Sequence, residues 1–242
     1  MRDASIHPIL DAKHAIESYE ARISDGGGRG ERLYKRGLRH HQLRHDKRDK
    51  VAPLGDIYTE PARLGGLTAF GADVVKECNR LGIVVDLAHA AHETVLGALK
   101  ASTQPVIVSH TSLDARPGKN PRMAKMMAPR LISKDHARVF ADAGGVIGVW
   151  TKLSDSIEEY VGGLKAMADV VGVDHVGIGS DTDILSTRAG RSTNAARPGL
   201  AGGFFKAPVA EMLRQGFTPD EVGKIGGGNF RRVFDRVTTS HA

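Results

Sequence analysis

Two short apolar runs in this chain each end in a histidine. Residues 83–89 read Ile-Val-Val-Asp-Leu-Ala-His, residues 105–110 read Pro-Val-Ile-Val-Ser-His, and a stretch with helical spacing of its apolar residues separates them. Short Val/Ile-rich runs are typical of buried parallel strands, and in α/β barrels the carboxyl ends of the strands face one shared mouth. The feature therefore predicts a strand–helix–strand unit that presents His89 and His110 at the same end. Two such imidazoles could hold one metal ion.

The rest of the chain repeats this unit. Residues 144–150 and 175–181 are again short apolar runs bounded by glycine, and the second ends in Asp181. Apolar residues at three- and four-residue spacing predict helices, with Ser133 as the N-cap of one and Asp135 in its first turn. The predicted helices span residues 71–81, 93–101, 133–143 and 157–171. Strands that alternate with helices in this way favour an α/β fold with a parallel sheet or barrel.

Length and composition agree with one domain. A chain of 242 residues with 40% hydrophobic content is long enough for a single well-buried core, so we expect one domain over residues 1–242. The single cysteine, Cys78, allows no internal disulfide. No apolar stretch approaches the roughly 18 residues that span a bilayer, and the amino terminus lacks the apolar core of a signal peptide. These features predict a soluble cytoplasmic protein without a membrane partner.

The net charge of +6 is concentrated in one segment. Residues 29–50 carry nine Lys and Arg side chains, but only one aromatic residue, Tyr34, and no recognisable nucleic-acid-binding motif. A basic run of this kind can attract nucleic acid or phosphate. A solvated helix face followed by a loop is the interpretation that we favour, and we expect no nucleic-acid partner.

Several short motifs occur in an order that points to one family. They are Ala15-Ile16-Glu17, the run from Gly65 to Gly71, Asn79-Arg80-Leu81-Gly82, Asp86-Leu87-Ala88-His89, the strand ending at His110, Arg130-Leu131-Ile132-Ser133, Gly144-Gly145-Val146-Ile147-Gly148, Gly179-Ser180-Asp181 and Gly228-Asn229-Phe230. From about residue 15 to residue 234, the chain resembles the membrane (renal) dipeptidase family of zinc peptidases. Many motifs in one order are a stronger signal than any single histidine pair.

The resemblance implies a TIM-like (β/α)8 metallohydrolase barrel that cleaves small dipeptides, often with a D-residue at the carboxyl side. Two zinc ions bridged by a hydroxide and a glutamate are expected in such a family. His89 and His110 resemble ligands of one zinc, and Glu17 resembles the bridging carboxylate. The metal would lower the pKa of bound water and polarise the scissile carbonyl.

The same resemblance assigns the remaining roles. Asp181 would bind the free amino group of the substrate and pass a proton to the leaving amine, and Arg130 would clamp the substrate carboxylate with two parallel hydrogen bonds. His45 matches the histidine that steadies the developing oxyanion. Alternatives stay open at two of these positions, namely Asp183 for Asp181 and Arg116 or Arg122 for Arg130.

The sequence also departs from the family pattern. The His-x-Asp pair of the first barrel strand, which supplies ligands to the other zinc, does not occur, and Glu17 is followed by Ser18 and Tyr19 instead of two glycines. The run Asp25-Gly26-Gly27 is a weaker rival for that position. About six βα units are recognisable, so we expect a barrel that is incomplete at its N-terminus. Its exposed strand edges would need cover from residues 1–10, from a partner subunit as in a homodimer, or from altered closure.

The ligand count sets the expected chemistry. Glu17, His89 and His110 could form one three-ligand zinc site with an open position for water, which is the pattern of a catalytic site. We therefore predict a metal-dependent dipeptidase that uses one zinc ion more readily than two. The alternative is a catalytically impaired or inactive relative that serves as a metal- or ligand-binding scaffold.

Overall fold

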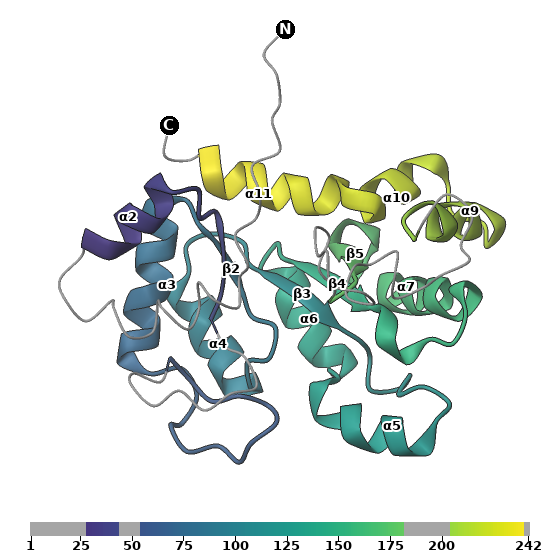
Figure 1. The fold of residues 1–242 in the computed structure, drawn as a ribbon, viewed down its shortest axis with the longest axis horizontal. Coiled ribbons are helices and arrows are strands. Elements are labelled where there is room, and N and C mark those ends of the chain that lie inside the picture. The colour runs from purple at the N-terminus through teal and green to yellow at the C-terminus, as the bar shows by residue number, and fades with distance from the viewer. Residues whose placement is uncertain (1–27, 44–53, 182–203, 240–242) are drawn as a thin grey trace, which may run out of the picture. The chain divides into compact units, whose positions relative to one another are not determined.

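The computed structural model describes residues 28–43, 54–181 and 204–239 of the chain. Its contacts divide the chain into two compact units, one formed by residues 1–106 with 234–242 and the other by residues 107–233. We describe each unit by itself (Figure 1). The predictions for Glu17, His45 and Asp183 lie outside the described residues.

The first unit contains two parallel strands and three of the helices in the described chain. Strand β1 pairs with β2 in a parallel register that places His41 opposite Val85. The elements are α2 (Gly28–Lys35), β1 (His40–Gln42), α3 (Ala69–Leu81), β2 (Val84–Asp86) and α4 (His92–Ala101). Helix α3 begins after Thr68, whose side-chain oxygen accepts the backbone N–H of Gly71 at 3.0 Å. The predicted strand–helix–strand alternation is thus present around β2.

Apolar side chains from α3, β2 and α4 form the core of this unit. Val75, Cys78 and Val84 are fully buried, and Ala98 of α4 is buried as well. Burial raises the pKa of the Cys78 thiol to about 12, so the thiolate needed for nucleophilic chemistry does not form near neutral pH. Cys78 is a free, buried cysteine with a packing role.

The second unit contains three parallel strands and most of the remaining helices that the structure describes. Strand β3 pairs with β4, and β4 pairs with β5, with Ile107 opposite Val146 and Ile147 opposite Val176. The elements are β3 (Ile107–Thr111), α5 (Pro121–Met127), η2 (Ala128–Arg130), α6 (Lys134–Asp142), β4 (Val146–Trp150), η3 (Thr151–Leu153), α7 (Ile157–Val171), η4 (Val173–His175), β5 (Val176–Gly179), α9 (Lys206–Arg214), α10 (Pro219–Gly223), the π-helical turn η5 (Lys224–Gly228) and α11 (Asn229–Thr239). The last residues of α11, from Phe234, belong to the first unit.

Two glycines allow the three strands of the second unit to approach one another closely. A Cβ at Gly148 on β4 would lie 2.1 Å from the backbone oxygen of Ser109 on β3. A Cβ at Gly179 on β5 would lie 2.6 Å from the same oxygen. Both distances are far below van der Waals contact, so only glycine fits at these two positions without moving the backbone. This close approach is next to His110, the residue that follows Ser109.

The sequence predicted most helices of the second unit closely. Helix α7 covers Ile157–Val171, the predicted range, and Ser133 caps α6 by accepting the N–H of His136 at 3.1 Å. The strands are shorter than predicted, since β2 stops at Asp86 and β5 stops at Gly179. The predicted α/β class with parallel strands is confirmed.

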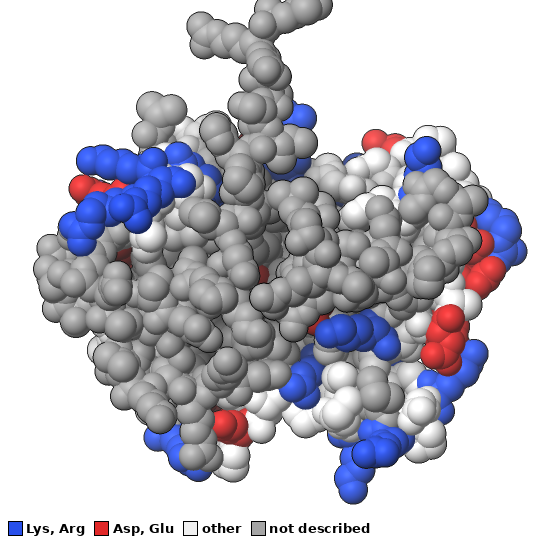
Figure 2. All heavy atoms as spheres, viewed as in Figure 1, with Lys and Arg blue, Asp and Glu red and all other residues white. Residues whose placement is uncertain are grey.

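The basic segment begins with helix α2, as the solvated-helix interpretation predicts. Figure 2 shows Lys and Arg side chains gathered over α2 with acidic atoms beside them. Part of this charge is engaged within the unit, because Arg39 stacks on Tyr34 at 3.5 Å and Arg80 contacts Glu31 at 3.0 Å. The absence of a nucleic-acid partner stays a prediction.

A bilayer-spanning helix is not found among the residues that the structure describes, since none combines sufficient length with sufficient apolar character.

Candidate active site

His89 follows β2 in a strained backbone conformation. Its φ is 67°, and its side chain is only 6% exposed. The Tyr58 ring stacks on the imidazole with ring centroids 5.5 Å apart, and the Tyr58 N–H donates to the His89 carbonyl at 3.3 Å. Just before it, the Asp86 carboxylate accepts the backbone N–H of Ala88 at 3.0 Å, which ends the strand and starts the turn. The sequence predicted this histidine at the strand end, whereas β2 ends at Asp86 and His89 lies in the turn three residues later.

His110 lies within β3 in the second unit. It is 7% exposed, and its Nδ1 lies 3.0 Å from the Ser109 hydroxyl. The Trp150 ring of β4 packs against the imidazole with centroids 5.5 Å apart. Hydrogen bonding at one ring nitrogen sets the tautomer and orientation of the other, which is how proteins prepare a histidine as a metal ligand.

Asp181 comes two residues after the end of β5 and is paired with a lysine. Its φ is 50°, and its Oδ2 accepts the Lys152 ammonium at 2.8 Å. Both side chains are partly exposed, with 48% of Lys152 and 33% of Asp181 accessible to solvent. The Lys152 ammonium also lies 5.1 Å from the centre of the Trp150 ring. The sequence analysis identified Asp181 but not Lys152, because the contact joins residues far apart in the chain.

His89 and Asp181 share an uncommon backbone geometry. Among the residues that the structure describes, they are the two non-glycine residues with positive φ. Such conformations cost about 1–3 kcal/mol each and persist where surrounding contacts enforce them, often at functional sites. The family resemblance assigns site roles to the same two residues, and the backbone strain is an independent feature of these positions.

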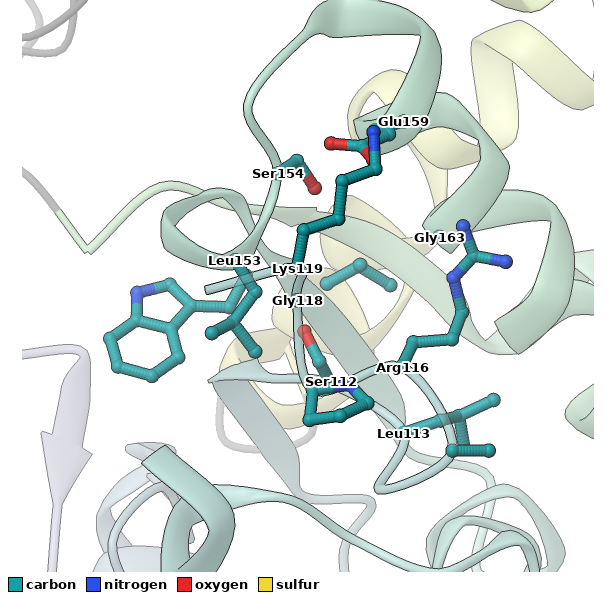
Figure 3. Close-up of a pocket in the computed structure, with 13 residues that line it drawn as sticks. Ser112, Leu113, Arg116, Gly118, Lys119, Leu153, Ser154, Glu159 and Gly163 are labelled. Carbon is teal, nitrogen blue, oxygen red and sulfur yellow. The ribbon is translucent and has the colours of Figure 1, made fainter. Parts of the chain in front are cut away.

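A cavity of about 270 Å³ opens beyond the carboxyl ends of β3 and β4. The segment after β3 supplies Ser112, Arg116 and Lys119, and Trp150 and Leu153 line it from the end of β4 and from η3. In Figure 3, Lys119 extends to Glu159 of α7, whereas Arg116 reaches toward Gly163. The carboxyl ends of the strands are the side at which α/β barrels carry their active sites.

The two cationic side chains that line the cavity, Lys119 and Arg116, make different contacts. The Lys119 ammonium forms a short ion pair with the Glu159 carboxylate. A hydrogen bond from Lys119, the backbone N–H of Asp155 and the charge of Arg116 all lower the pKa of Glu159. Arg116 instead extends over α7, where a Cβ at Gly162 would lie 3.2 Å from its Nη2. The cavity therefore presents the Arg116 guanidinium, whose planar fork suits a carboxylate.

Arg130 occupies a different environment at the end of η2. Its Nη1 donates to the Met126 carbonyl at 3.2 Å, and its own carbonyl accepts the Thr111 hydroxyl at 2.9 Å. Thr111 follows His110, so the backbone of Arg130 is held near the end of β3. The cavity favours Arg116 over Arg130 as the residue that would meet a ligand carboxylate. The assignment of Arg130 stays a prediction, as does that of Arg122 among its rivals.

A buried polar cluster at β1 and β2 was missed in the sequence. Asp86 is 1% exposed, and its Oδ2 lies 3.1 Å from the His40 Nε2. His41, the next residue, is 4% exposed. Burial and the neighbouring His40 lower the pKa of His41 to about 4, although Asp86 acts in the opposite direction. This contact is not visible in the sequence, because it depends on the register of β1 against β2.

The expected metal ligands are distributed over both units and beyond the described residues. His89 belongs to the first unit and His110 to the second, while Glu17 and the oxyanion histidine His45 lie outside the described residues. Within the described ranges, no group of three or more His, Cys, Asp or Glu side chains is arranged to hold a metal ion. The three-ligand zinc site stays a prediction.

Comparison with known proteins identifies the family. A family model described as membrane dipeptidase (peptidase family M19) matches residues 30–242. The chain belongs to this family. Membership confirms the resemblance that the motifs predicted.

Individual relatives of this M19 chain agree with the assignment. It is 30% identical over 223 residues to "Dipeptidase verJ" of Clonostachys rogersoniana, a match that covers 89% of the chain and 52% of the relative. The chain thus spans about half the length of the curated relative that it matches.

Two solved structures share its fold. An amidohydrolase from Pseudomonas aeruginosa superposes with a TM-score of 0.72 at 25% identity, over 89% of this chain and 70% of that one. A metallo peptidase from Rhodobacter sphaeroides, solved with a phosphinate mimic of the dipeptide L-Ala-D-Ala, gives a TM-score of 0.65 at 21% identity, over 86% of this chain and 58% of that one.

Proposed function

We propose that this M19 chain is a metal-dependent dipeptidase that hydrolyses the peptide bond of small dipeptides through zinc-activated water. One observation carries the proposal. The two non-glycine residues with positive φ in the described chain, His89 and Asp181, are those to which the family resemblance assigns metal binding and substrate binding. Strain that is kept at each of these two positions, in a chain of this family, supports a functional role for each residue.

The donor chemistry of the described residues suits zinc. His89 and His110 are almost completely buried histidines, and an imidazole nitrogen is a common zinc ligand. With Nδ1 of His110 engaged by Ser109, Nε2 is the nitrogen that would bind the metal. Glu17 is the proposed third ligand, which makes one zinc ion more readily held than two. Bound there, zinc would supply a water of lowered pKa and a polarised scissile carbonyl.

The remaining residues would bind and orient the dipeptide. We assign the substrate carboxylate to an arginine of the segment after β3, where the cavity favours Arg116 and the motif order favours Arg130. Asp181 would contact the amino group of the substrate and pass a proton to the leaving amine. His45 would donate a hydrogen bond to the developing oxyanion.

Metal content and hydrolysis, measured on the same preparation, test the proposal. The protein is purified without chelator, its zinc is measured by elemental analysis, and a panel of L,L and L,D dipeptides is assayed with added zinc. We expect about one zinc per chain and turnover of at least one dipeptide. His110→Asn should lose both, because it removes a ligand nitrogen.

A matched histidine variant provides the control. His175 lies at the amino end of β5, where its Nδ1 contacts the Gly145 carbonyl at 2.8 Å, so His175→Asn should retain zinc and activity. Zinc binding without turnover of any dipeptide would favour the alternative, a metal-binding scaffold. Absence of both would contradict the proposal, and two tight zinc equivalents would contradict the single-metal assignment.

A further inference from the structure

The Lys152–Asp181 ion pair lies at the place where the proposed function needs an unpaired carboxylate. A free dipeptide carries an ammonium group, and Asp181 is the residue proposed to bind it. Here Asp181 Oδ2 already accepts the Lys152 ammonium at 2.8 Å. A second ammonium at the same carboxylate would stand within a few ångströms of the first, where two like charges repel even at high dielectric.

The surroundings hold Lys152 in this position. Thr151, the residue before it, is 6% exposed, and its hydroxyl donates to the Ser180 carbonyl at 3.4 Å, which ties η3 to the segment that carries Asp181. Trp150 offers its ring face to the ammonium at 5.1 Å. Trp150 also packs on His110, so the lysine is placed in the same unit and beside the same aromatic residue as the proposed zinc ligand.

We propose that Lys152 is a specificity-determining residue that turns the site away from free amino termini and toward substrates whose nitrogen is acylated, such as N-acyl dipeptides. This inference rests on the proposed function. An amide has one donor and one acceptor, and the ion pair has the matching groups. The carboxylate of Asp181 accepts the amide N–H, and the Lys152 ammonium donates to the acyl carbonyl.

A second donor beside the pair fits the same ligand chemistry. The Nε1 of Trp150 is buried and has no hydrogen-bond partner among the residues described. Trp150 lines the cavity beyond β3 and β4. A buried donor without an acceptor is costly, and an additional carbonyl on the ligand would satisfy it. An acyl group supplies that carbonyl, whereas an ammonium group supplies only more donors.

The test compares two substrates on four proteins, namely the wild type and three lysine variants. The ratio of kcat/KM for N-acetyl-L-Ala-D-Ala to that for L-Ala-D-Ala is measured with zinc added. We expect the wild-type ratio to be one or more, and we expect Lys152→Met to lower it about tenfold, because the free ammonium then has the Asp181 carboxylate to itself. Lys152→Gln should lower the ratio in the same direction. Lys165→Met is the matched control, since Lys165 is also exposed and paired with an aspartate, at 3.9 Å on α7.

Binding separates failure of this inference from failure of the proposed function. The phosphinate mimic of L-Ala-D-Ala and its N-acetyl derivative are titrated into each zinc-loaded protein by calorimetry. If the protein turns over dipeptides but the kcat/KM ratio of Lys152→Met and of Lys152→Gln stays within twofold of the wild-type ratio, the inference alone is overturned. A second outcome is that no dipeptide is turned over, that the wild type binds the N-acetyl probe more tightly than the free probe, and that Lys152→Met reverses this preference. That outcome overturns the proposed function and supports the inference. No binding of either probe overturns both.

Discussion

Buried His41 should make the stability of this protein fall as the pH falls from 6.5 to about 4. The pKa of His41 is lowered from 6.5 to about 4, mainly because burial disfavours the charged imidazolium, with a smaller contribution from His40. In the unfolded chain the same side chain takes up a proton near pH 6.5. The unfolded state therefore binds more protons than the folded state between these two values, and the free energy of unfolding rises with pH across that window.

The size of the effect follows from the two pKa values. At pH 7.5 His41 is neutral in both states and contributes almost nothing to the pH dependence. With 6.5 for the unfolded chain and about 4 for the folded one, linkage predicts a loss of about 1 kcal/mol at pH 5.5 and of about 2 to 3 kcal/mol at pH 4.5. Below pH 4 the loss approaches a plateau, because both states are then protonated.

Urea unfolding at several pH values isolates this contribution. Other groups titrate over the same range, so the informative quantity is the difference between wild type and a variant without the imidazole. His41→Leu places an apolar side chain at this position of β1 and should show a pH dependence that is flatter by about 2 to 3 kcal/mol between pH 7.5 and 4.5. His41→Gln should be flatter by the same amount, although its absolute stability will differ. Parallel curves for wild type and both variants, within about 0.5 kcal/mol, would refute the reasoning.

Three further predictions follow from the described contacts. Gly148→Ala should destabilise the protein by about 3 kcal/mol, because the new Cβ would lie 2.1 Å from the Ser109 oxygen, and it should weaken zinc binding by displacing β3; thermal unfolding and metal titration check both effects. Asp56→Asn should lower the free energy of unfolding by about 2 kcal/mol, because this carboxylate is 6% exposed and accepts the backbone N–H groups of residues 63, 64 and 66. Asp73→Asn is the control, since that carboxylate is 73% exposed and its loss should cost under about 0.5 kcal/mol in urea unfolding. Arg116→Ala should raise KM about tenfold with little change in kcat, and an equal or larger rise in Arg130→Ala alone would return the carboxylate to Arg130.

The Asp56 carboxylate adds a pH dependence of its own to the stability. Burial raises the pKa of Asp56, but the backbone N–H groups of Arg63, Gly66, Leu64 and Gly65 lower it by more. A lowered folded-state pKa means that this stabilisation is present above the unfolded value and is lost as the pH falls through the folded value. It therefore acts in the same direction as His41 but at lower pH, below about 4, which keeps the two contributions separable in the urea experiment.

Periodicity predicted the elements of this fold better than their ends. Helix α7 was predicted without error because its apolar spacing and the cap at Ser156 are both local. Strand β2 was predicted to run to His89 but ends at Asp86. The cause is a side-chain contact, since Asp86 binds the backbone N–H of Ala88 and the chain turns before the histidine. Composition alone does not distinguish an apolar residue in a strand from one in such a turn.

The sequence pattern indicates candidate site residues at or after strands but not contacts between distant segments. His89, His110 and Asp181 follow from the pattern, and their roles stay predictions. Lys152 is not, because its partner follows a different strand. The sequence also leaves open the choice among three arginines after β3, since it depends on how that loop folds back, with Leu113 paired to Ile132.

Family motifs in this chain serve two physical purposes, and the structure separates them. Asn229 is 3% exposed and donates to the carbonyls of Val173 and Val176, at 2.7 and 2.8 Å, so it anchors α11 to the start of β5. Such a residue supplies hydrogen bonds to buried backbone carbonyls and stabilises the fold. His89 and Asp181 do the reverse, because each keeps a backbone conformation that costs energy. A residue retained only for folding has no need of that cost. The strained positions are therefore where chemistry should be sought first in this chain, and the lysine beside one of them is the feature most able to change which substrate it accepts.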